Sequence, residues 1–517
     1  MKKTLFLAIL PSLSFAEGID KKIDNAFAPI SDFFSSVVFF TINDIPFVLM
    51  LLVFSALFFT IYFAFPNIRY FRVAVNTVRG KYDDLDINKI EDEDIKGTIK
   101  NESEDGEVSH FQALATAVSG TVGNGNIAGV ALAIALGGPG ATFWMIICGL
   151  LGMSTKFVEC TLGVQYRDVG EDGTVYGGPM YYISKGLKDR GFQFFGKIAA
   201  VLFAIFCIGG SFGGGNAAQS NQATIVLKDL MGLESTAAGA IIGCIIAVIV
   251  GIIIIGGIKR IANVTEKVVP FMALMYLLAC LYIILSNFSF IDDAVRLIIS
   301  EAFNPTAVGV GSVIGVLLVG FKRAAFSNEA GAGSASIAHS AVKTKYAASE
   351  GLVALLEPFI DTVVICTMTA LVIIIFNFGG YFEYGGDGGM VYIDGVGYEG
   401  AGITSKAFAQ YIPFSNVFLT IAVVLFAVST MISWSYYGLQ SWKFIFGRGY
   451  YADLTYKILF LLFIVIGAAS SMSSIWAFSD AMIFAMIFPN MVGLFFLFPV
   501  VKKELAKYLD AIKKKNL

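Results

Sequence analysis

Long apolar stretches separated by short polar segments occupy the chain from residue 45 to residue 500. Roughly eleven of these stretches approach the length of about twenty residues that an α-helix needs to cross a bilayer. The pattern therefore predicts an all-α polytopic membrane protein. The stretches cover approximately residues 45–65, 111–136, 140–166, 198–227, 237–255, 268–285, 307–334, 352–378, 417–439, 457–470 and 475–500.

Two of the predicted spans are interrupted by glycine and polar residues. Residues 119–129 contain four glycines and two asparagines, and residues 320–334 form a similar stretch five spans later. Glycine and asparagine weaken a helix, and unwound backbone persists in lipid only where it is buried in protein or lines a cavity. Interruptions at corresponding places in two halves indicate the binding site of a secondary transporter. Close helix packing through the glycines at 125 and 129 is the alternative for the first stretch.

The position of the second break stays open between residues 320–321 and residues 327–333. Lys322, Arg323 and Glu329 lie in this span. Charged side chains are costly in lipid, so these three must face protein or water.

Other polar residues inside the spans allow two interpretations each. Asn216 and Gln219 share one helix face, which suits a substrate cavity or a contact between helices. Lys156 and Glu159 stand three residues apart, so we expect them to form an ion pair. The two histidines, His110 and His339, lie near predicted cytoplasmic helix ends, where a structural role and a proton relay are the alternatives.

Composition excludes several classes of protein. Hydrophobic residues make up 56% of the chain and charged residues 15%, values typical of a membrane protein. The net charge of −3 argues against a nucleic-acid partner. The six cysteines fall in apolar stretches without ligand spacing, so we expect neither a disulfide nor a metal centre. No polar stretch is long enough for a catalytic domain.

The termini carry topological signals. Residues 1–16 combine two lysines, an apolar run and a small-x-small site, which predicts a cleaved signal peptide; an uncleaved anchor is the alternative. Basic clusters follow the first span and every second core span, so they are expected on the cytoplasmic side. The mature N-terminus is then outside and the basic C-terminal tail is cytoplasmic.

Several motifs resemble those of the alanine/glycine:cation symporter family, which includes the bacterial sodium:alanine carriers. The resemblance extends over about residues 107–500, and its pieces are residues 122–129, 137–145, 177–181, 326–335 and 489–490. It implies a leucine-transporter-type fold of two inverted five-helix repeats, preceded here by one extra N-terminal transmembrane helix. It also implies sodium-coupled import of alanine or glycine across the bacterial inner membrane by alternating access.

The resemblance further implies the partners of the chain. They are a small neutral amino acid, a sodium ion and membrane lipid, with protons as the alternative coupling ion. No cofactor, no enzymatic activity and no obligate protein partner are expected.

The resemblance also suggests site residues. The substrate is expected to contact Thr121, Gly123, Asn124 and Gly125, with the N–H groups of Asn124 and Gly125 directed at its carboxylate. Gln219 is expected to face the cavity, and Phe321 and Trp434 to close a small pocket. The sodium ligands are expected to be backbone or hydroxyl oxygens, the type that suits a hard cation. They come from Ser119, Val122, Ser429 and Thr430.

These expectations divide the chain into seven parts. They are a signal peptide (1–16), an external N-terminus with the first transmembrane helix (17–66), a cytoplasmic loop (67–106), a first five-helix repeat (107–287), an external connection (288–305), a second five-helix repeat (306–500) and a cytoplasmic basic tail (501–517).

Cleavage after Ala16 predicts that the mature protein begins near Glu17. N-terminal sequencing of the purified protein tests this expectation. Recovery of an intact Met1 would contradict it.

Overall fold

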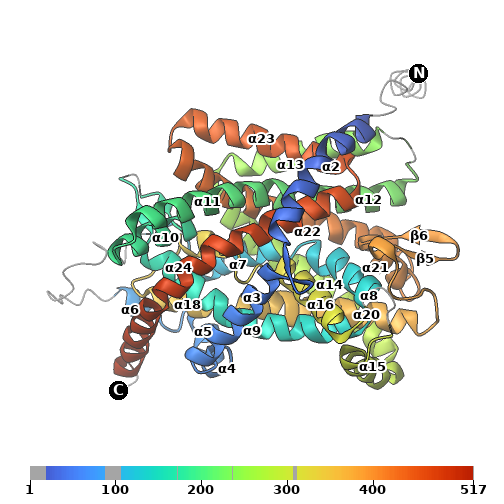
Figure 1. The fold of residues 1–517 in the computed structure, drawn as a ribbon, viewed down its shortest axis with the longest axis horizontal. Coiled ribbons are helices and arrows are strands. Elements are labelled where there is room, and N and C mark those ends of the chain that lie inside the picture. Colours follow the sequence, from blue (N-terminus) through green and yellow to red (C-terminus); the bar gives the residue numbers. More distant parts are fainter. Residues whose placement is uncertain are drawn as a thin grey trace.

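The computed structural model describes residues 19–87, 106–171, 173–233, 235, 237–306 and 311–515 (Figure 1). The predicted signal peptide lies outside the described residues, as do residues 88–105 of the predicted cytoplasmic loop. Helices account for almost all regular structure. The described strands form three antiparallel pairs, β1 (Thr41–Ile42) with β2 (Ile45–Pro46), β3 (Asp168–Val169) with β4 (Val175–Tyr176), and β5 (Val391–Ile393) with β6 (Val396–Tyr398).

The N-terminal helices precede the predicted first repeat. They are α2 (Ile19–Val38), α3 (Phe47–Tyr62), α4 (Pro66–Arg69), α5 (Phe71–Val78) and α6 (Asp84–Ile87). In Figure 1, α2 and α3 run across the face formed by α24 (Met472–Lys515), and α2 packs along that helix. The N-terminal segment is therefore attached to the outside of the helical core.

The described part of the predicted first repeat contains eight α-helices and two π-helical turns. They are α7 (His110–Thr121), the turn Gly125–Gly129, α8 (Val130–Gly137), α9 (Gly140–Gln165), α10 (Pro179–Asp189), α11 (Gln193–Phe212), the turn Gly213–Ala217, α12 (Ala218–Met231), α13 (Ala238–Ile254) and α14 (Gly257–Ser286). The connection to the second half holds a short 3₁₀ turn (Phe288–Phe290) and α15 (Ile291–Phe303).

The predicted second repeat begins with another interrupted helix. Its elements are α16 (Val313–Asn328), α17 (Ala335–His339), α18 (Ala347–Ala354), α19 (Leu356–Pro358), a π-helical turn (Phe359–Cys366), α20 (Thr367–Asn377), a 3₁₀ turn (Asp387–Gly389), α21 (Ala401–Ala409), α22 (Ser415–Phe446), α23 (Tyr450–Ala469) and α24.

Seven of the described helical segments are long and apolar enough to cross a membrane. The pair His110–Thr121 and Gly125–Gly137 adds an eighth if it is one span, and two shorter apolar helices are Phe47–Tyr62 and Ala238–Ile254. The outer helices α13 and α14 expose large apolar side chains, including Val248 and Phe271, as lipid-facing helices do. The chain is thus a multi-pass membrane protein, while the expected total of about eleven spans stays a prediction.

The first predicted break is present in the structure. A capping box formed by Ser109 and Gln112 starts α7, and the helix ends at Thr121. The chain resumes as a π-helical turn at Gly125, and the two halves are bent by 50°. The second break follows α16: Glu329, Gly331 and Gly333 have φ angles of 54°, 97° and 85°. Of the two positions left open by the sequence, the break is therefore the one at residues 327–333.

Packing brings the two breaks to the middle of the molecule. The turn Gly125–Gly129 contacts both α16 and the π-helical turn Phe359–Cys366, and α7 packs against α22. The turn Gly213–Ala217 contacts α22 and α24. Elements that are far apart in the sequence thus surround the unwound segments, which places them where a buried site can form.

Candidate functional site

Side chains satisfy the backbone of the first break. The Gly123 N–H donates to Asn126 Oδ1 at 2.8 Å, and the Asn124 N–H donates to Gln219 Oε1 at 3.0 Å. Asn124 also donates from Nδ2 to the Gln219 carbonyl at 3.2 Å. The expected role of the Asn124 N–H as a donor to the substrate carboxylate needs correction, because this N–H is already bonded. Of the two expected backbone donors, Gly125 is the one that remains.

Trp434 joins the two breaks. Its Nε1–H lies 3.2 Å from the Gly120 carbonyl and 2.9 Å from Glu329 Oε1, and the side chain is buried. The Ser334 hydroxyl donates to the other Glu329 oxygen. A Cβ at Gly215 would lie 2.1 Å from Trp434 Cγ, so the glycine there makes room for the indole ring. A residue of each break is therefore held by one buried side chain of α22.

A small cavity lies between the breaks. Its volume is about 10 Å³, near the minimum that holds one water molecule. Polar residues that line it include Glu329, Thr121 and Thr430, and apolar residues line the rest. The lining residues are Gly120, Thr121, Gly125, Gly214, Gln219, Phe326, Glu329, Thr430, Trp434 and Ile483.

Four of the seven expected substrate residues line this cavity, namely Thr121, Gly125, Gln219 and Trp434. Gly123 and Asn124 belong to the same unwound turn but are not part of the lining.

Phe321 does not line the cavity, which corrects the expected closing pair. Its ring lies 6.5 Å from the Trp144 ring, centroid to centroid, on the side of α9. Phe326, five residues later on α16, forms the wall instead. Five residues are well over one helical turn, so the two rings leave the helix at different heights and in different directions.

The sequence left two roles open for Asn216 and Gln219, lining a cavity or joining two helices, and the structure gives one role to each. Gln219 lines the cavity and holds the first break. Asn216 donates from Nδ2 to the Phe460 carbonyl at 2.6 Å, which is a contact between helices.

The four expected sodium residues lie where α7 meets α22. Ser119 Oγ donates to the Ser429 carbonyl at 2.8 Å, and Ser429 Oγ donates to the Phe426 carbonyl at 3.0 Å. Thr430 Oγ1 is buried without a hydrogen-bond partner among the described residues, and Thr430 faces the cavity. Val122 caps α7, and its side chain is buried in the core.

A second group of oxygens was missed from the sequence. Asp361 accepts hydrogen bonds from Asn126 Nδ2 at 2.7 Å, Ser327 Oγ at 2.9 Å and Thr362 Oγ1 at 2.7 Å. The side chain is fully buried, and no ion pair to it is found within the described part of the chain. An ionisable residue inside a predicted span is itself a signal of a functional site, and Asp361 in residues 352–378 carried that signal.

A chain of buried charged groups was also missed. Lys156 Nζ lies 3.0 Å from Glu357 Oε1, so Lys156 does not form the expected pair with Glu159. Glu159 instead accepts from Asn490 Nδ2 at 2.8 Å. The prediction was wrong because it considered only residues on the same helix. Glu357 lies on another helix, and residue spacing along α9 cannot predict such a partner.

The two histidines belong to the same buried chain. His339 Nδ1 lies 2.5 Å from Glu350 Oε1, and His110 Nδ1 contacts the other oxygen of Glu350. His339 Nε2 lies 3.7 Å from Glu357 Oε2, which continues the chain to Lys156. The histidines thus join α7, α17 and α18 through one carboxylate, in keeping with a structural role.

Comparisons with known proteins identify the family to which the chain belongs. The model of the sodium:alanine symporter family matches residues 30–517. A sodium/alanine symporter of Methanococcus maripaludis, AgcS, is 38% identical over 471 residues, covering 91% of this chain and 95% of that protein. The "Probable sodium/glutamine symporter GlnT" of Bacillus subtilis is 32% identical, covering 78% of each.

A solved structure shares the fold. The crystal structure of MhsT in complex with L-phenylalanine superposes with a TM-score of 0.51 at 13% identity, covering 79% of this chain and 99% of MhsT. The expected leucine-transporter-type fold is thereby confirmed. The chain belongs to the sodium:alanine symporter family, a family of transporters, and is a sodium-coupled amino acid symporter of the membrane.

Proposed function

We propose that this symporter imports alanine or glycine, driven by the sodium gradient across the bacterial inner membrane. The observation that supports the proposal is the narrow space between the two breaks, about 10 Å³, which must widen to admit any amino acid and must widen least for glycine or alanine. Growing a ligand by one methylene in a closely packed wall costs about 1–3 kcal/mol, so a small side chain is favoured. Compared with alanine, glutamine adds four heavy atoms beyond the β carbon. The small space therefore argues against glutamine as the substrate, although the name of the relative GlnT suggests it.

The cavity lining suits a zwitterion. Glu329 carries a buried carboxylate at one end, and its two oxygens accept from Trp434 and Ser334 with lone pairs to spare for an ammonium group. Gly125 and Thr121 lie on the unwound turn, where a bare N–H and a hydroxyl can donate to a carboxylate. The proposed pose puts the ammonium near Glu329 and the carboxylate near Gly125.

Two positions are candidates for the coupling sodium. The first is the expected group of Ser119, Val122, Ser429 and Thr430, supported by the unpaired Thr430 hydroxyl beside the cavity. The second is Asp361, whose charge has no cationic side chain paired to it in the described structure and whose donors can turn to present lone pairs. Both offer oxygen ligands, the kind that sodium prefers.

The proposed topology sets which side of the protein faces the outside. Lys443 lies in the last turn of α22 and Arg448 follows that helix, while Lys502 and Lys503 lie in the last part of α24. Placing these clusters in the cytoplasm puts the acidic loop 379–402 and the N-terminus outside. The two breaks then allow the halves of α7–α8 and of α16–α17 to open the cavity alternately to each side.

Uptake into proteoliposomes tests the proposed function. Radiolabelled alanine and glycine should accumulate under an inward sodium gradient, and the accumulation should collapse when choline replaces sodium. Glutamine should compete at least ~10-fold more weakly than alanine, because it costs more than one extra methylene. Equal competition by glutamine would contradict the small-substrate proposal, and uptake driven equally well by a proton gradient without sodium would contradict the choice of ion.

Variants distinguish the two candidate sodium positions. Thr430→Val keeps the side-chain shape and removes the hydroxyl, while Ser429→Ala removes the neighbouring hydroxyl. Loss of one buried polar contact, about 1–3 kcal/mol, should raise the half-saturating sodium concentration roughly tenfold in uptake assays. Asp361→Asn is the matched test of the second position. A shift in Asp361→Asn with none in Thr430→Val or Ser429→Ala would move the site to Asp361.

Two glycines of the unwound turn give opposite expectations for the same substitution. A Cβ at Gly123 would lie 2.4 Å from Thr430 Oγ1, whereas a Cβ at Gly125 would meet Ser327 at 3.4 Å, an ordinary contact. Overpacking costs about 1–3 kcal/mol, so Gly123→Ala should weaken alanine binding by about tenfold or more. Gly125→Ala should change it less than ~3-fold by the same measure. Equal effects in equilibrium binding would show that the turn does not pack against Thr430 as described.

A further inference from the structure

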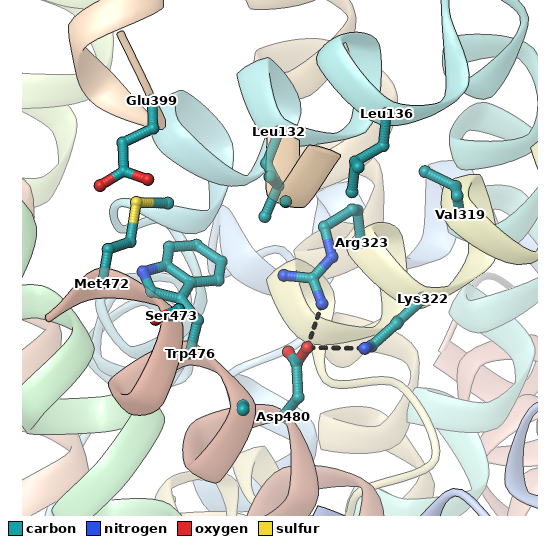
Figure 2. A pocket seen from close by; sticks show the side chains of 12 residues that line it. Leu132, Leu136, Val319, Lys322, Arg323, Glu399, Met472, Ser473, Trp476 and Asp480 are labelled. Atoms are coloured by element: carbon teal, nitrogen blue, oxygen red, sulfur yellow. Dashed lines mark hydrogen bonds and ion pairs between the residues drawn. The ribbon is translucent and has the colours of Figure 1, made fainter. Parts of the chain in front are cut away.

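The contact between α16 and α24 separates the small cavity from a larger one. The larger cavity has a volume of about 270 Å³, and α8, α16 and α24 form its walls together with Glu399 (Figure 2). Trp476 on α24 lines the larger cavity, and Phe326 on α16 lines the small one. Their rings stack with the centroids 5.0 Å apart, so the pair stands between the two cavities.

Charged side chains in the larger cavity join the same two helices. Asp480 Oδ2 on α24 lies 3.0 Å from Lys322 Nζ and also accepts from Arg323 Nη2, as the dashed lines in Figure 2 show. Glu399 lines the cavity but forms no ion pair with either cation within the described part of the chain. One positive charge of this cluster is therefore left without a carboxylate of its own.

Aromatic rings face both cations. The guanidinium carbon of Arg323 lies 5.4 Å from the ring centroids of Phe326 and Trp476. Lys322 Nζ lies 4.5 Å from the centroid of the Phe39 ring. The negative face of an aromatic ring attracts a cation. The rings therefore supply attraction that a single carboxylate cannot give to two cations.

Phe39 belongs to the N-terminal segment, which lies outside the two predicted repeats. Its ring lies 5.3 Å, centroid to centroid, from that of Phe484, which follows Asp480 by about one turn of α24. Further along the same helix, Ser31 Oγ of α2 donates to the Ser474 carbonyl at 2.9 Å. The N-terminal segment thus follows α24, and its Phe39 also reaches a side chain of α16.

A tight hairpin follows Phe39 directly. Asn43 and Asp44 have φ angles of 50° and 64°, the left-handed pair that a two-residue turn between β1 and β2 requires. The turn brings the ring of Phe40 onto that of Phe47, with the centroids 5.4 Å apart. Phe39 is therefore held by α24 on one side and by the hairpin on the other.

We propose that Phe39 is a positioning residue for transport, whose ring holds the Lys322 ammonium on Asp480 and so keeps α16 against α24 while the outer side is closed. The inference rests on the proposed alternating opening of the small cavity. When α16 leaves α24, Lys322 loses the carboxylate and the ring together. Contacts made in only one of two states shift the balance toward that state. A segment outside both repeats thus favours the state that is closed to the outside.

Labelling of a cysteine in the small cavity tests the role of Phe39. Ile483→Cys places a thiol in the lining, and Cys244→Ser removes the exposed native cysteine, which together give the reporter chain. A membrane-impermeant maleimide is added to right-side-out vesicles that contain the full reporter chain, without substrate and at one sodium concentration. Phe39→Leu keeps an apolar side chain and removes the ring face. Because the Lys322 side chain is 35% exposed, the effect should be moderate, with labelling at least ~3-fold faster.

Two matched variants separate positioning from packing. Phe39→Tyr retains the ring face, so its labelling rate should stay within ~2-fold of the reporter chain. Phe40→Leu removes the neighbouring ring, which stacks on Phe47, and should also stay within ~2-fold. Equal acceleration by Phe40→Leu, or acceleration that persists in Phe39→Tyr, would make Phe39 a packing residue and overturn the inference.

A double-mutant cycle tests whether Phe39 acts through Lys322. Lys322→Gln alone should accelerate labelling more than Phe39→Leu, because it removes the ion pair and the ring contact together. Adding Phe39→Leu to Lys322→Gln should then change the rate by less than ~2-fold. Two effects that multiply independently would contradict the proposed contact.

The outcomes separate this inference from the proposed function. Labelling that Phe39→Leu leaves unchanged overturns the inference while alanine uptake by the unmodified chain stands. Absence of alanine uptake contradicts the proposed substrate, whereas the labelling cycle needs no substrate and still measures the coupling of Phe39 to Lys322. Phe39→Met also lacks the ring face and should accelerate labelling as Phe39→Leu does, which keeps the test decisive if one of the two variants fails to fold.

Discussion

Unwound backbone inside a membrane must find hydrogen-bond partners within the protein, and this requirement governs the centre of the molecule. Asn126 and Gln219 receive the N–H groups of Gly123 and Asn124. Trp434 donates to the carbonyl of Gly120, and Asn490 donates to the carbonyl of Gly331. Each break is therefore stable only together with the amide or indole side chains that replace its missing helix bonds. The polar residues around the cavity are as much a part of the fold as of the site.

Most of these partners belong to helices other than the broken ones. Gln219 lies on α12, Trp434 on α22 and Asn490 on α24. A movement of any of these helices changes the hydrogen bonds of the unwound turns, and a ligand in the turns changes the free energy of each arrangement. This is the reciprocity that coupling between sites requires. The geometry of the breaks thus links the small cavity to the surrounding helices without any additional element.

The sequence predicted the features that depend on local composition. Clusters of glycine and asparagine weaken a helix wherever it packs, so the first break was predictable, and the second was narrowed to two positions. Features that depend on tertiary contacts were missed. The direction of Phe321 depends on how α16 packs against α9, and Lys156 found Glu357 rather than its neighbour Glu159. Asp361 and Asn126 are 235 residues apart, and no spacing rule joins them.

The buried charges explain why the helices around them pack in one specific arrangement. Burying an ion pair gains little over an apolar contact, whereas removing one partner is costly, about 3–5 kcal/mol, because the other charge is left alone. Lys156, Glu357, His339 and Glu350 connect α9, the segment around α19, α17 and α18 in such a chain. If one of these helices moved away from the others, a buried charge would lose its partner. The helices are therefore expected to move together. The chain therefore favours movement of these helices as a unit, which is what two discrete states of a transporter need.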